Sequence, residues 1–243
     1  MLLVTCEHGG NRIPREYQYL FEGYEAALAS HRGHDPGSLA LANDLAGACG
    51  APLVASTVSR LLVELNRSPG HRELYSERTR DLAPEVKAHI AARYYEPYRH
   101  EVERRVREGI AAGRCVFHLS SHSFTPALDG VTRNADVGFL YDPGRRRERR
   151  LCGQLSTALA ERIAPLRVRR NYPYRGYNDG LTTFLRRRFR PDAYLGVEIE
   201  VNQKHALRGG APWHALRRSI VRSVLDVLEV DAPWHRRCSA PSP

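Results

Sequence analysis

The chain has 243 residues, and its hydrophobic content of 42% is enough to fill one large core. Its net charge of +10 would favour a nucleic-acid-binding protein, but the arginines are dispersed and lack interleaved stacking aromatics, so we expect no nucleic-acid partner. No apolar run approaches the roughly 20 residues that span a bilayer, and the first apolar segment is shorter than a signal-peptide core of about 7–15 residues, so we expect a cytoplasmic protein without a membrane partner.

Short apolar runs rich in β-branched residues alternate along the chain with helical stretches. This alternation is typical of an α/β protein with a mostly parallel sheet covered by helices. The predicted strands are residues 2–6, 52–57, 60–65, 114–119, 136–141, 166–170 and 194–201. The predicted helices are residues 37–49, 83–112, 145–163, 180–189 and 212–229, and we expect the second to bend at Pro97.

Two long segments, 66–82 and 123–135, carry neither pattern and are predicted to be loops, and loops of that length tend to be functional or disordered. No linker, repeat or low-complexity block interrupts the chain before Asp231, where the periodicity ends. We therefore predict a single domain over residues 1–230 and an irregular tail over 231–243. The five cysteines are odd in number and scattered, which argues against a disulfide framework, and we expect Cys6 and Cys115 to be buried thiols.

Polar residues come directly after two predicted strands and end a third. Glu7 and His8 follow the first strand, His122 follows the strand over 114–119, and the last strand carries Glu198 and Glu200. Ligands of open α/β sheets bind beyond the carboxyl ends of the strands. The sequence therefore predicts that two imidazoles and at least two carboxylates meet at one edge of the sheet.

Two histidines, one carboxylate and an open fourth position make a catalytic zinc site. We predict Asp35 as the carboxylate to join His8 and His122, because it stands where the chain enters a helix. Asp35 could instead cap that helix, with Pro36 at the first helical position, or fill both roles. His8 could likewise bond only a turn carbonyl. Since these ligand types suit several metals, the expected cofactor is Zn²⁺ or another divalent transition metal.

Alternate residues of the last strand share one face, so Glu198, Glu200 and Asn202 project to the same side. A buried carboxylate needs a cation, a hydrogen bond or an open cleft. Glu200 lies nearer the carboxyl end and is predicted to be the general base. Glu198 is predicted to hold the residues of the site in position, or to pair with an arginine.

Arginines beside the predicted site could recognise an acidic substrate, because a guanidinium binds a carboxylate in bidentate fashion. Arg60 and Arg67 bracket the run over 61–65, with Asn66 beside the second arginine, although in so arginine-rich a chain either could be a surface charge. The loop over 171–180 is aromatic, glycine-bearing and polar at once, which predicts that it faces the substrate. In this loop we single out two residues, Tyr174 and Arg175.

Several blocks of the sequence resemble the N-formylglutamate amidohydrolase family, beginning with Val-Thr-Cys-Glu-His-Gly-Gly-Asn-Arg-Ile-Pro. The matching blocks are residues 4–14, 34–37, 59–67, 121–124, 135–138, 171–174 and 196–202. The resemblance implies a three-layer α/β/α fold related to zinc carboxypeptidases and phosphorylase/hydrolase-like proteins. It also implies hydrolysis of N-formyl-L-glutamate, or a similar small acidic N-acylamino acid, to formate or another carboxylate and the amino acid.

By the same resemblance, His8, Asp35 and His122 match the zinc ligands, and Glu200 matches the catalytic glutamate. Arg67 falls in the family's Asn-Arg pair, where binding of the substrate carboxylate is implied. For the reaction we predict that Arg133 or Arg67 stabilises the developing oxyanion and that Asn202 contributes to substrate binding.

The sequence departs from the family pattern at two places. Glu7 replaces the proline that precedes the first histidine in the better-characterised branch, and it could add a carboxylate to the site or hold His8 in place. Gln203 stands where basic or apolar residues are common. The alternatives are therefore a metallocarboxypeptidase-like enzyme or an N-deacylase of another acyl substrate, and, as a non-enzyme, a basic nucleic-acid-binding module. The oligomeric state is left open.

Overall fold

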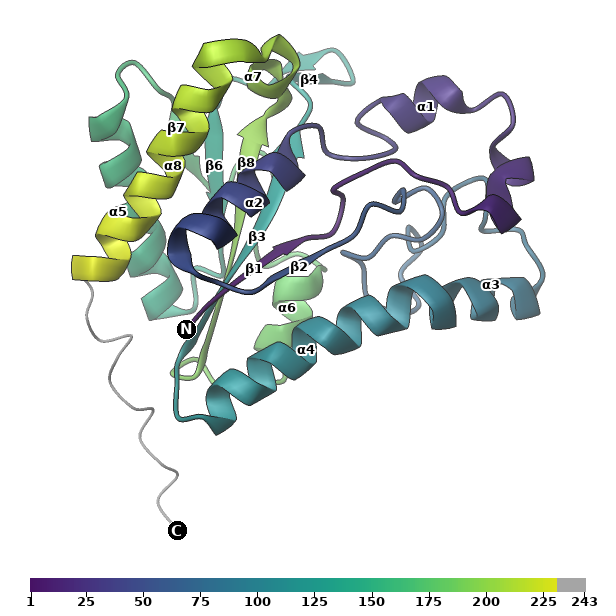
Figure 1. Cartoon of the computed structure of the whole chain (residues 1–243), viewed down its shortest axis with the longest axis horizontal. Coiled ribbons are helices and arrows are strands. Elements are labelled where there is room, and N and C mark those ends of the chain that lie inside the picture. Colours follow the sequence, from purple (N-terminus) through teal and green to yellow (C-terminus); the bar gives the residue numbers. More distant parts are fainter. Residues whose placement is uncertain (231–243) are drawn as a thin grey trace.

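A six-stranded sheet in the order β2-β1-β3-β8-β6-β7 forms the centre of the computed structural model, which describes residues 1–230 (Figure 1). The strands are β1 (Leu2–Cys6), β2 (Leu53–Ala55), β3 (Val116–Phe124), β6 (Val137–Leu140), β7 (Val168–Arg170) and β8 (Tyr194–Asn202). All neighbours pair in parallel except β6 and β8, which are antiparallel. The predicted α/β class is confirmed, while the predicted tail over 231–243 lies outside the described residues.

Helices cover both faces of this sheet, which gives three layers (Figure 1). One face is covered by α2 (Ser38–Cys49), α5 (Arg146–Arg162) and α8 (Gly210–Val230), and the other by α4 (Glu96–Ala111) and α6 (Leu181–Arg186). Each face has its own buried apolar core, because alternate strand residues point to opposite sides. In the described part of the chain, no helix is long and apolar enough to cross a membrane.

The two faces of the sheet differ towards the carboxyl ends of the strands. In β8, Leu195, Val197 and Ile199 belong to the core beneath α5 and α8, whereas Tyr194 belongs to the core beneath α4 and α6. On this second face the side chains of β8 become polar towards its carboxyl end, where Glu198 and Glu200 lie. The same change occurs in β1 and β3, so the polar ends of three adjacent strands lie side by side.

The strand predicted over residues 60–65 is wrong, because these residues form turns. The apolar side chains of this run are buried in the core beneath α4 and α6, which accounts for the misleading pattern. The backbone is satisfied locally, with the amide of Leu62 donating to the carbonyl of Ser59 at 3.0 Å. Burial alone can therefore produce an apolar run of strand length without a strand.

The helix predicted over 83–112 is interrupted in a different way from the expected bend. It consists of α3 (Pro84–Ile90), a π-helical segment η2 (Ala91–Tyr95) and α4. The irregularity is the π-helical turn directly before Pro97, and the backbone stays helical through Ile90, Tyr95 and Glu96. The two α-helical segments are therefore joined by a π-helical turn into one continuous helical stretch.

Several short elements were not expected from the pattern. They are a 3-10 helix η1 (Arg15–Phe21), α1 (Glu25–Ala29), the hairpin of β4 (Ala127–Leu128) and β5 (Val131–Thr132), and α7 (Gln203–Arg208). The hairpin lies inside the predicted loop over 123–135. Its turn is Asp129-Gly130, both with positive φ, as a two-residue hairpin loop requires.

Thiol and arginine side chains are also buried in the interior of the protein. Cys6 and Cys115 are buried thiols, as expected, and burial raises the pKa of Cys6 to about 12. Arg186 of α6 is buried and pairs with Glu148 at 3.1 Å. Its guanidinium also donates to the carbonyl of Gly196 at 2.7 Å, so this arginine ties α5 and α6 to β8.

Candidate active site

The candidate site lies where β1, β3 and β8 end on the polar face of the sheet. His8 follows β1 directly after Glu7, and Asp35 comes from the loop that precedes α2. His122 lies within β3, not after it as predicted, because this strand continues to Phe124. Its register partner in β8 is Glu200, so neighbouring strands deliver these two side chains to the same place.

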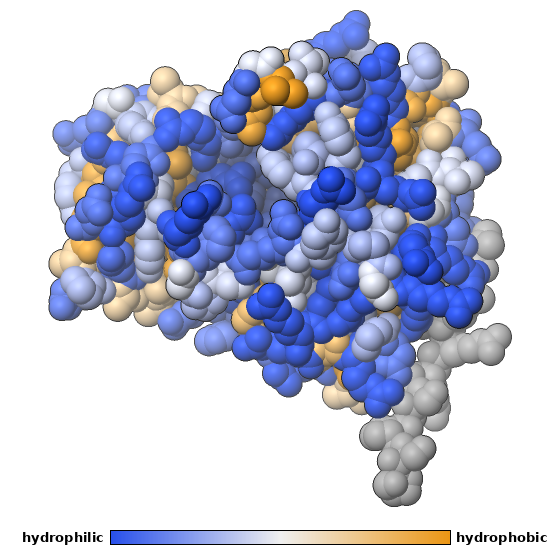
Figure 2. Space-filling view, turned by 180° about the vertical axis from the view of Figure 1, so that it is seen from behind, coloured by the Kyte–Doolittle hydropathy of each residue, from blue (hydrophilic) through white to orange (hydrophobic). Residues whose placement is uncertain are grey.

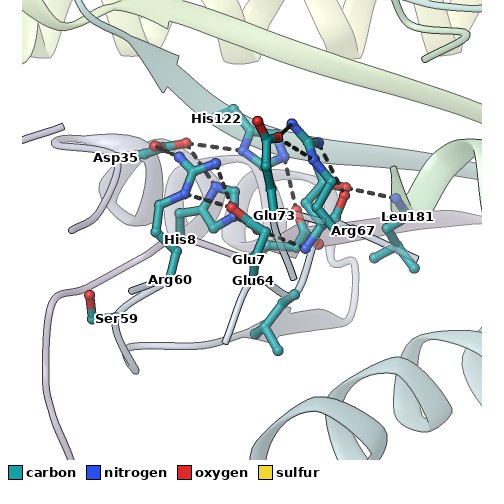
Figure 3. A network of polar contacts seen from close by, with 12 residues as sticks. Glu7, His8, Asp35, Ser59, Arg60, Glu64, Arg67, Glu73, His122 and Leu181 are labelled. Carbon is teal, nitrogen blue, oxygen red and sulfur yellow. Dashed lines mark hydrogen bonds and ion pairs between the residues drawn. The ribbon is translucent and has the colours of Figure 1, made fainter. Parts of the chain in front are cut away.

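Three buried side chains direct ligand atoms towards one point (Figure 3). The Nδ1 atoms of His8 and His122 lie 3.2 and 3.0 Å from the same oxygen of Asp35, Oδ2. All three residues are at most 4% exposed. The structure therefore brings together the three predicted ligands, and they could hold a metal ion.

The other nitrogen of each imidazole faces a second carboxylate. Nε2 of His8 contacts Glu64, and Nε2 of His122 lies 3.0 Å from Oε2 of Glu7. A neutral imidazole has one N–H, and if the outer carboxylate accepts it, Nδ1 presents a lone pair to Asp35. Two lone pairs and a carboxylate oxygen repel one another unless a cation lies among them. Carboxylates behind histidines are typical of metal sites.

Glu7 supports His122 and not His8, which corrects one of the two roles expected for it. Besides His122, its carboxylate accepts hydrogen bonds from Ser120 Oγ at 2.5 Å and from the hydroxyl of Tyr98 at 2.8 Å. Burial by itself would raise the pKa of Glu7, but the contacts with His122 and Ser120 lower it well below its usual range. Glu7 is therefore a buried, ionised anchor.

Glu64 is the functional residue that the sequence interpretation missed. Its carboxylate accepts from the backbone amide of Asn66 at 2.9 Å and from Nε of Arg60 at 2.7 Å. Burial would raise its pKa, whereas Arg60 and His8 lower it below the usual range. A signal was present, because Glu64 is a charged residue within an apolar run and such a residue needs a partner when buried.

Asp35 serves the site rather than the helix that follows it. The N-cap residue of α2 is Gly37, and no side chain caps the helix. The hydroxyl of Ser38 donates to the backbone carbonyl of Asp35 and not to its carboxylate. The carboxylate instead faces the imidazoles and accepts a hydrogen bond from Nη1 of Arg60 at 3.0 Å. Burial would raise the pKa of Asp35, but His8 and His122 hold it well below the usual range.

The two glutamates of β8 have different surroundings. Glu200 is 5% exposed, and its Oε2 atom has no hydrogen-bond partner among the described residues. Burial raises the pKa of Glu200 to about 8, with the negative charges of Asp35 and Glu198 acting in the same direction. Glu198 accepts a hydrogen bond from Thr182 at 2.6 Å, so its bonding partner is a hydroxyl and not the expected arginine.

A cavity of about 150 Å³ opens over the three ligand atoms. Figure 2 shows a hollow surrounded by hydrophilic residues on this side of the molecule. The volume is below the ≈300–1,000 Å³ of pockets for drug-sized ligands, so a small polar molecule fits best. The cavity is lined by His8, Asp35, Arg60, Asn66, Arg67, His122, Ser123, Tyr174, Arg175, Asn178, Asp179, Glu198 and Glu200.

The arginines in the cavity wall are not equivalent. Arg60 is engaged by Asp35 and Glu64, and its pKa rises above the usual value because these charges outweigh its burial. Arg67 donates to the carbonyl of Asp179 at 3.2 Å and lies 3.4 Å from Glu73. Arg175 is exposed, and its side chain has no hydrogen bond or ion pair with any residue in 1–230. Arg67 and Arg175 are therefore the cations available to a ligand.

Two other predicted residues lie outside the cavity wall. Arg133 donates to the hydroxyl of Tyr174 at 3.0 Å and stacks on its ring, so it approaches the cavity only through that side chain. Asn202 is fully buried and donates to the carbonyl of Ala135 at 2.9 Å. It also caps α7 by accepting from the amide of Lys204 at 3.1 Å. These contacts indicate a structural role for Asn202.

The sequence model of the N-formylglutamate amidohydrolase family matches residues 1–207. The solved structure of gene product Atu2144 from Agrobacterium tumefaciens is 30% identical, with a TM-score of 0.79 over 94% of this chain and 90% of that chain. N-formylglutamate amidohydrolase from Ralstonia eutropha JMP134 is 20% identical, with a TM-score of 0.70 over 93% of both chains, and supports the same fold. No curated protein matches the sequence. The chain therefore belongs to the N-formylglutamate amidohydrolase family and is an enzyme that hydrolyses amide bonds.

Proposed function

We propose that this protein is a zinc-dependent amidohydrolase that cleaves the formyl amide of N-formyl-L-glutamate or of a similar small acidic N-acylamino acid. The observation that carries the proposal is the convergence of His8, Asp35 and His122 on one point beneath a small cavity. Membership of the family supplies the type of bond, and the cluster supplies a place for the metal.

Two of the three spacings between the ligand atoms, those that involve Asp35, suit a tetrahedral metal ion. Zinc bonds of about 2.0–2.1 Å place neighbouring ligand atoms roughly 3.3 Å apart. The distances from Asp35 Oδ2 to the two imidazole nitrogens, 3.2 and 3.0 Å, are close to that value. Two histidines and one carboxylate leave a fourth position free for chemistry. When bound, such an ion would lower the pKa of water and polarise the amide carbonyl.

The charges of the cavity support an acidic substrate. Arg67 and Arg175 can bind carboxylate groups of the substrate, because neither is enclosed by buried acidic partners as Arg60 is. Arg60 holds Asp35 and Glu64 in place, so we assign it to positioning the site rather than to recognition. Arg133 has the same kind of role for Tyr174, whose ring lines the cavity.

Glu200 is the residue that we assign to proton transfer. Glu200 lines the cavity, is the register partner of His122 and has one carboxylate oxygen without a hydrogen-bond partner among the described residues, which suits a group that takes a proton from attacking water. The same carboxyl can then return the proton to the amine nitrogen as the C–N bond breaks. A cation bound by the cluster would oppose the effect of burial and lower the pKa of Glu200 below the value of about 8 found for the side chains alone.

Elemental analysis together with formate release from N-formyl-L-glutamate tests the proposal. We expect one metal ion per chain, chelator-sensitive formate release, and loss of both in His122→Ala. His100→Ala, an exposed histidine of α4, is the matched control and keeps both. A His122→Ala protein with a full complement of metal would contradict the site, and chelator-resistant hydrolysis would contradict metal dependence.

A further inference from the structure

A second cavity, of about 290 Å³, adjoins the first. The two cavities share four lining residues, Asp35, Arg60, Ser123 and Tyr174. Because Asp35 belongs to the ligand cluster, the second cavity begins beside the reacting centre and leads away from it. A ligand held at the cluster can therefore extend into either cavity.

Part of the wall of the second cavity is apolar. Leu61, Phe124 and Leu128 line it, and the last of these lies in the β4–β5 hairpin. Arg32 and Glu77 also line it and form an ion pair with each other, and the rest of the wall carries His31, Thr125 and Gln203. In contrast to the first cavity, with Arg67 and Arg175, this wall offers apolar surface and no unpaired arginine or lysine for a carboxylate among the described residues that line it.

We propose that the second cavity binds the acyl part of the substrate, so that the enzyme hydrolyses N-acyl amino acids with linear aliphatic acyl groups larger than formyl. The inference rests on the proposed function. An N-acyl amino acid has two ends, and the arginines of the first cavity hold the acidic one. The acyl end then passes Asp35 towards Leu128. A formyl group has only a hydrogen beyond its carbonyl carbon and would leave the second cavity empty.

The reaction itself is unchanged by the length of the acyl group. Water adds through its oxygen to the amide carbon, the C–N bond breaks, and the nitrogen takes up a proton. The products are the acyl carboxylate and the free amino acid, and no oxidant or further reactant is needed. Each methylene that becomes buried against the apolar wall strengthens binding by roughly twofold to fourfold, with partial exposure reducing the effect.

Two measurements on the N-formyl, N-acetyl, N-butyryl and N-hexanoyl derivatives of glutamate test this inference. The first is kcat/KM of the metal-loaded enzyme, which we expect to rise from formyl to butyryl. The second is calorimetric binding of the same series to Glu200→Gln, in which we expect Kd to fall by at least fourfold from formyl to butyryl. Binding provides a readout that does not depend on turnover.

Substitution in the hairpin locates the effect. Leu128→Trp would fill the second cavity, so we expect the ratio of kcat/KM between the hexanoyl and formyl substrates to fall at least tenfold. The control is Val131→Trp, because Val131 is the register partner of Leu128 on β5 but is 66% exposed and lines neither cavity. It should leave that ratio unchanged.

The outcomes separate this inference from the proposed function. Strong preference for formyl over every longer acyl group would overturn the acyl cavity and leave the proposed function intact. An unchanged ratio in Leu128→Trp would also overturn it. If none of the four glutamate derivatives is hydrolysed by metal-loaded enzyme, the proposed function itself fails.

Discussion

The two faces of the central sheet are built from the same strands but have opposite chemistry near the carboxyl ends. In β8, Val197, Ile199 and Val201 are buried against α5 and α8 in a continuous apolar core. The residues between them, Glu198 and Glu200, face the other side and line the cavity. The face that is apolar throughout carries stability, and the face that becomes polar carries the chemistry.

This difference shows how the site tolerates so much buried charge. Glu7, Asp35 and Glu64 are at most 6% exposed, and each contacts an imidazole or a guanidinium. A buried charge is costly unless it is paired and hydrogen-bonded. Changes on the polar face should therefore alter metal binding, catalysis or pH dependence, whereas changes on the apolar face should alter stability alone.

Glu200→Gln should have the largest effect on the polar face. It removes the group assigned to proton transfer, so we expect kcat to fall by about 10²–10⁴-fold. The metal content should be unchanged, because the ligand cluster is made of other residues. Steady-state kinetics with elemental analysis of the same samples provides the measurement, and full activity in this variant would exclude the role.

Glu7→Gln should weaken the metal without abolishing the site. Loss of the carboxylate behind His122 is expected to lower metal affinity by about 10–100-fold. Competition with a chelator measures this affinity. Glu101→Gln, which breaks a surface ion pair with Arg104, is the control and should leave it unchanged. Equal affinities in the two variants would show that Glu7 does not support the cluster.

His118 should make stability depend on pH, although it lies on the same face of β3 as His122. It is fully buried between Thr5 and Tyr194, at 2.8 Å from each, and burial lowers its pKa to about 4 from an ordinary value of 6.5. Between these values the unfolded chain binds more protons than the folded one, so stability falls as the pH decreases from 6.5 to 4. The loss through this residue is roughly 3 kcal/mol.

Denaturant unfolding of metal-free protein between pH 7 and pH 4 measures this dependence. His118→Gln has no titrating group at this position, so its free energy of unfolding should vary less with pH over that interval. An identical pH dependence in the variant and the parent protein would assign the effect to other groups.

Ile199→Val should have the smallest effect, although it lies between the two glutamates of the site. Its side chain is fully buried on the apolar face, so we expect a loss of about 0.5–1.5 kcal/mol in the free energy of unfolding. The kcat/KM should stay within twofold of the parent value. Denaturant unfolding and kinetics measure the two quantities, and a tenfold loss of activity would show that the faces are not independent.

Much of the site could be predicted because it follows from local rules. His8 comes directly after a strand, and Glu198 and Glu200 share a face because strand residues alternate. Asp35 follows from its place where the chain enters a helix, a place that also allows a helix cap, and the resemblance to the family supports its role as a ligand. The order of the main helices and strands could also be predicted, because the spacing of apolar residues alternates along the chain between the pattern of a strand and that of a helix.

Other features could not be predicted, for identifiable reasons. The apolar run around Leu62 looks like a strand because it is buried, and burial does not depend on secondary structure. The role of Glu64 depends on its contact with His8, which is far away in the chain. Asn202 does not have the substrate-binding role expected for it, because its side chain donates to a carbonyl of the segment before β6. Each of these outcomes depends on contacts between residues far apart in the chain.

The α/β class, the alternation that separates an apolar face from a polar one, and the types of residue that could bind a metal all follow from the order of residues in the chain. Which carboxylate contacts each imidazole follows from the folded arrangement alone: Glu64 contacts His8, and Glu7 contacts His122. The physical reason is that periodicity is set by the local backbone, whereas the partner of a buried charge is set by whichever segments the fold brings within hydrogen-bonding distance.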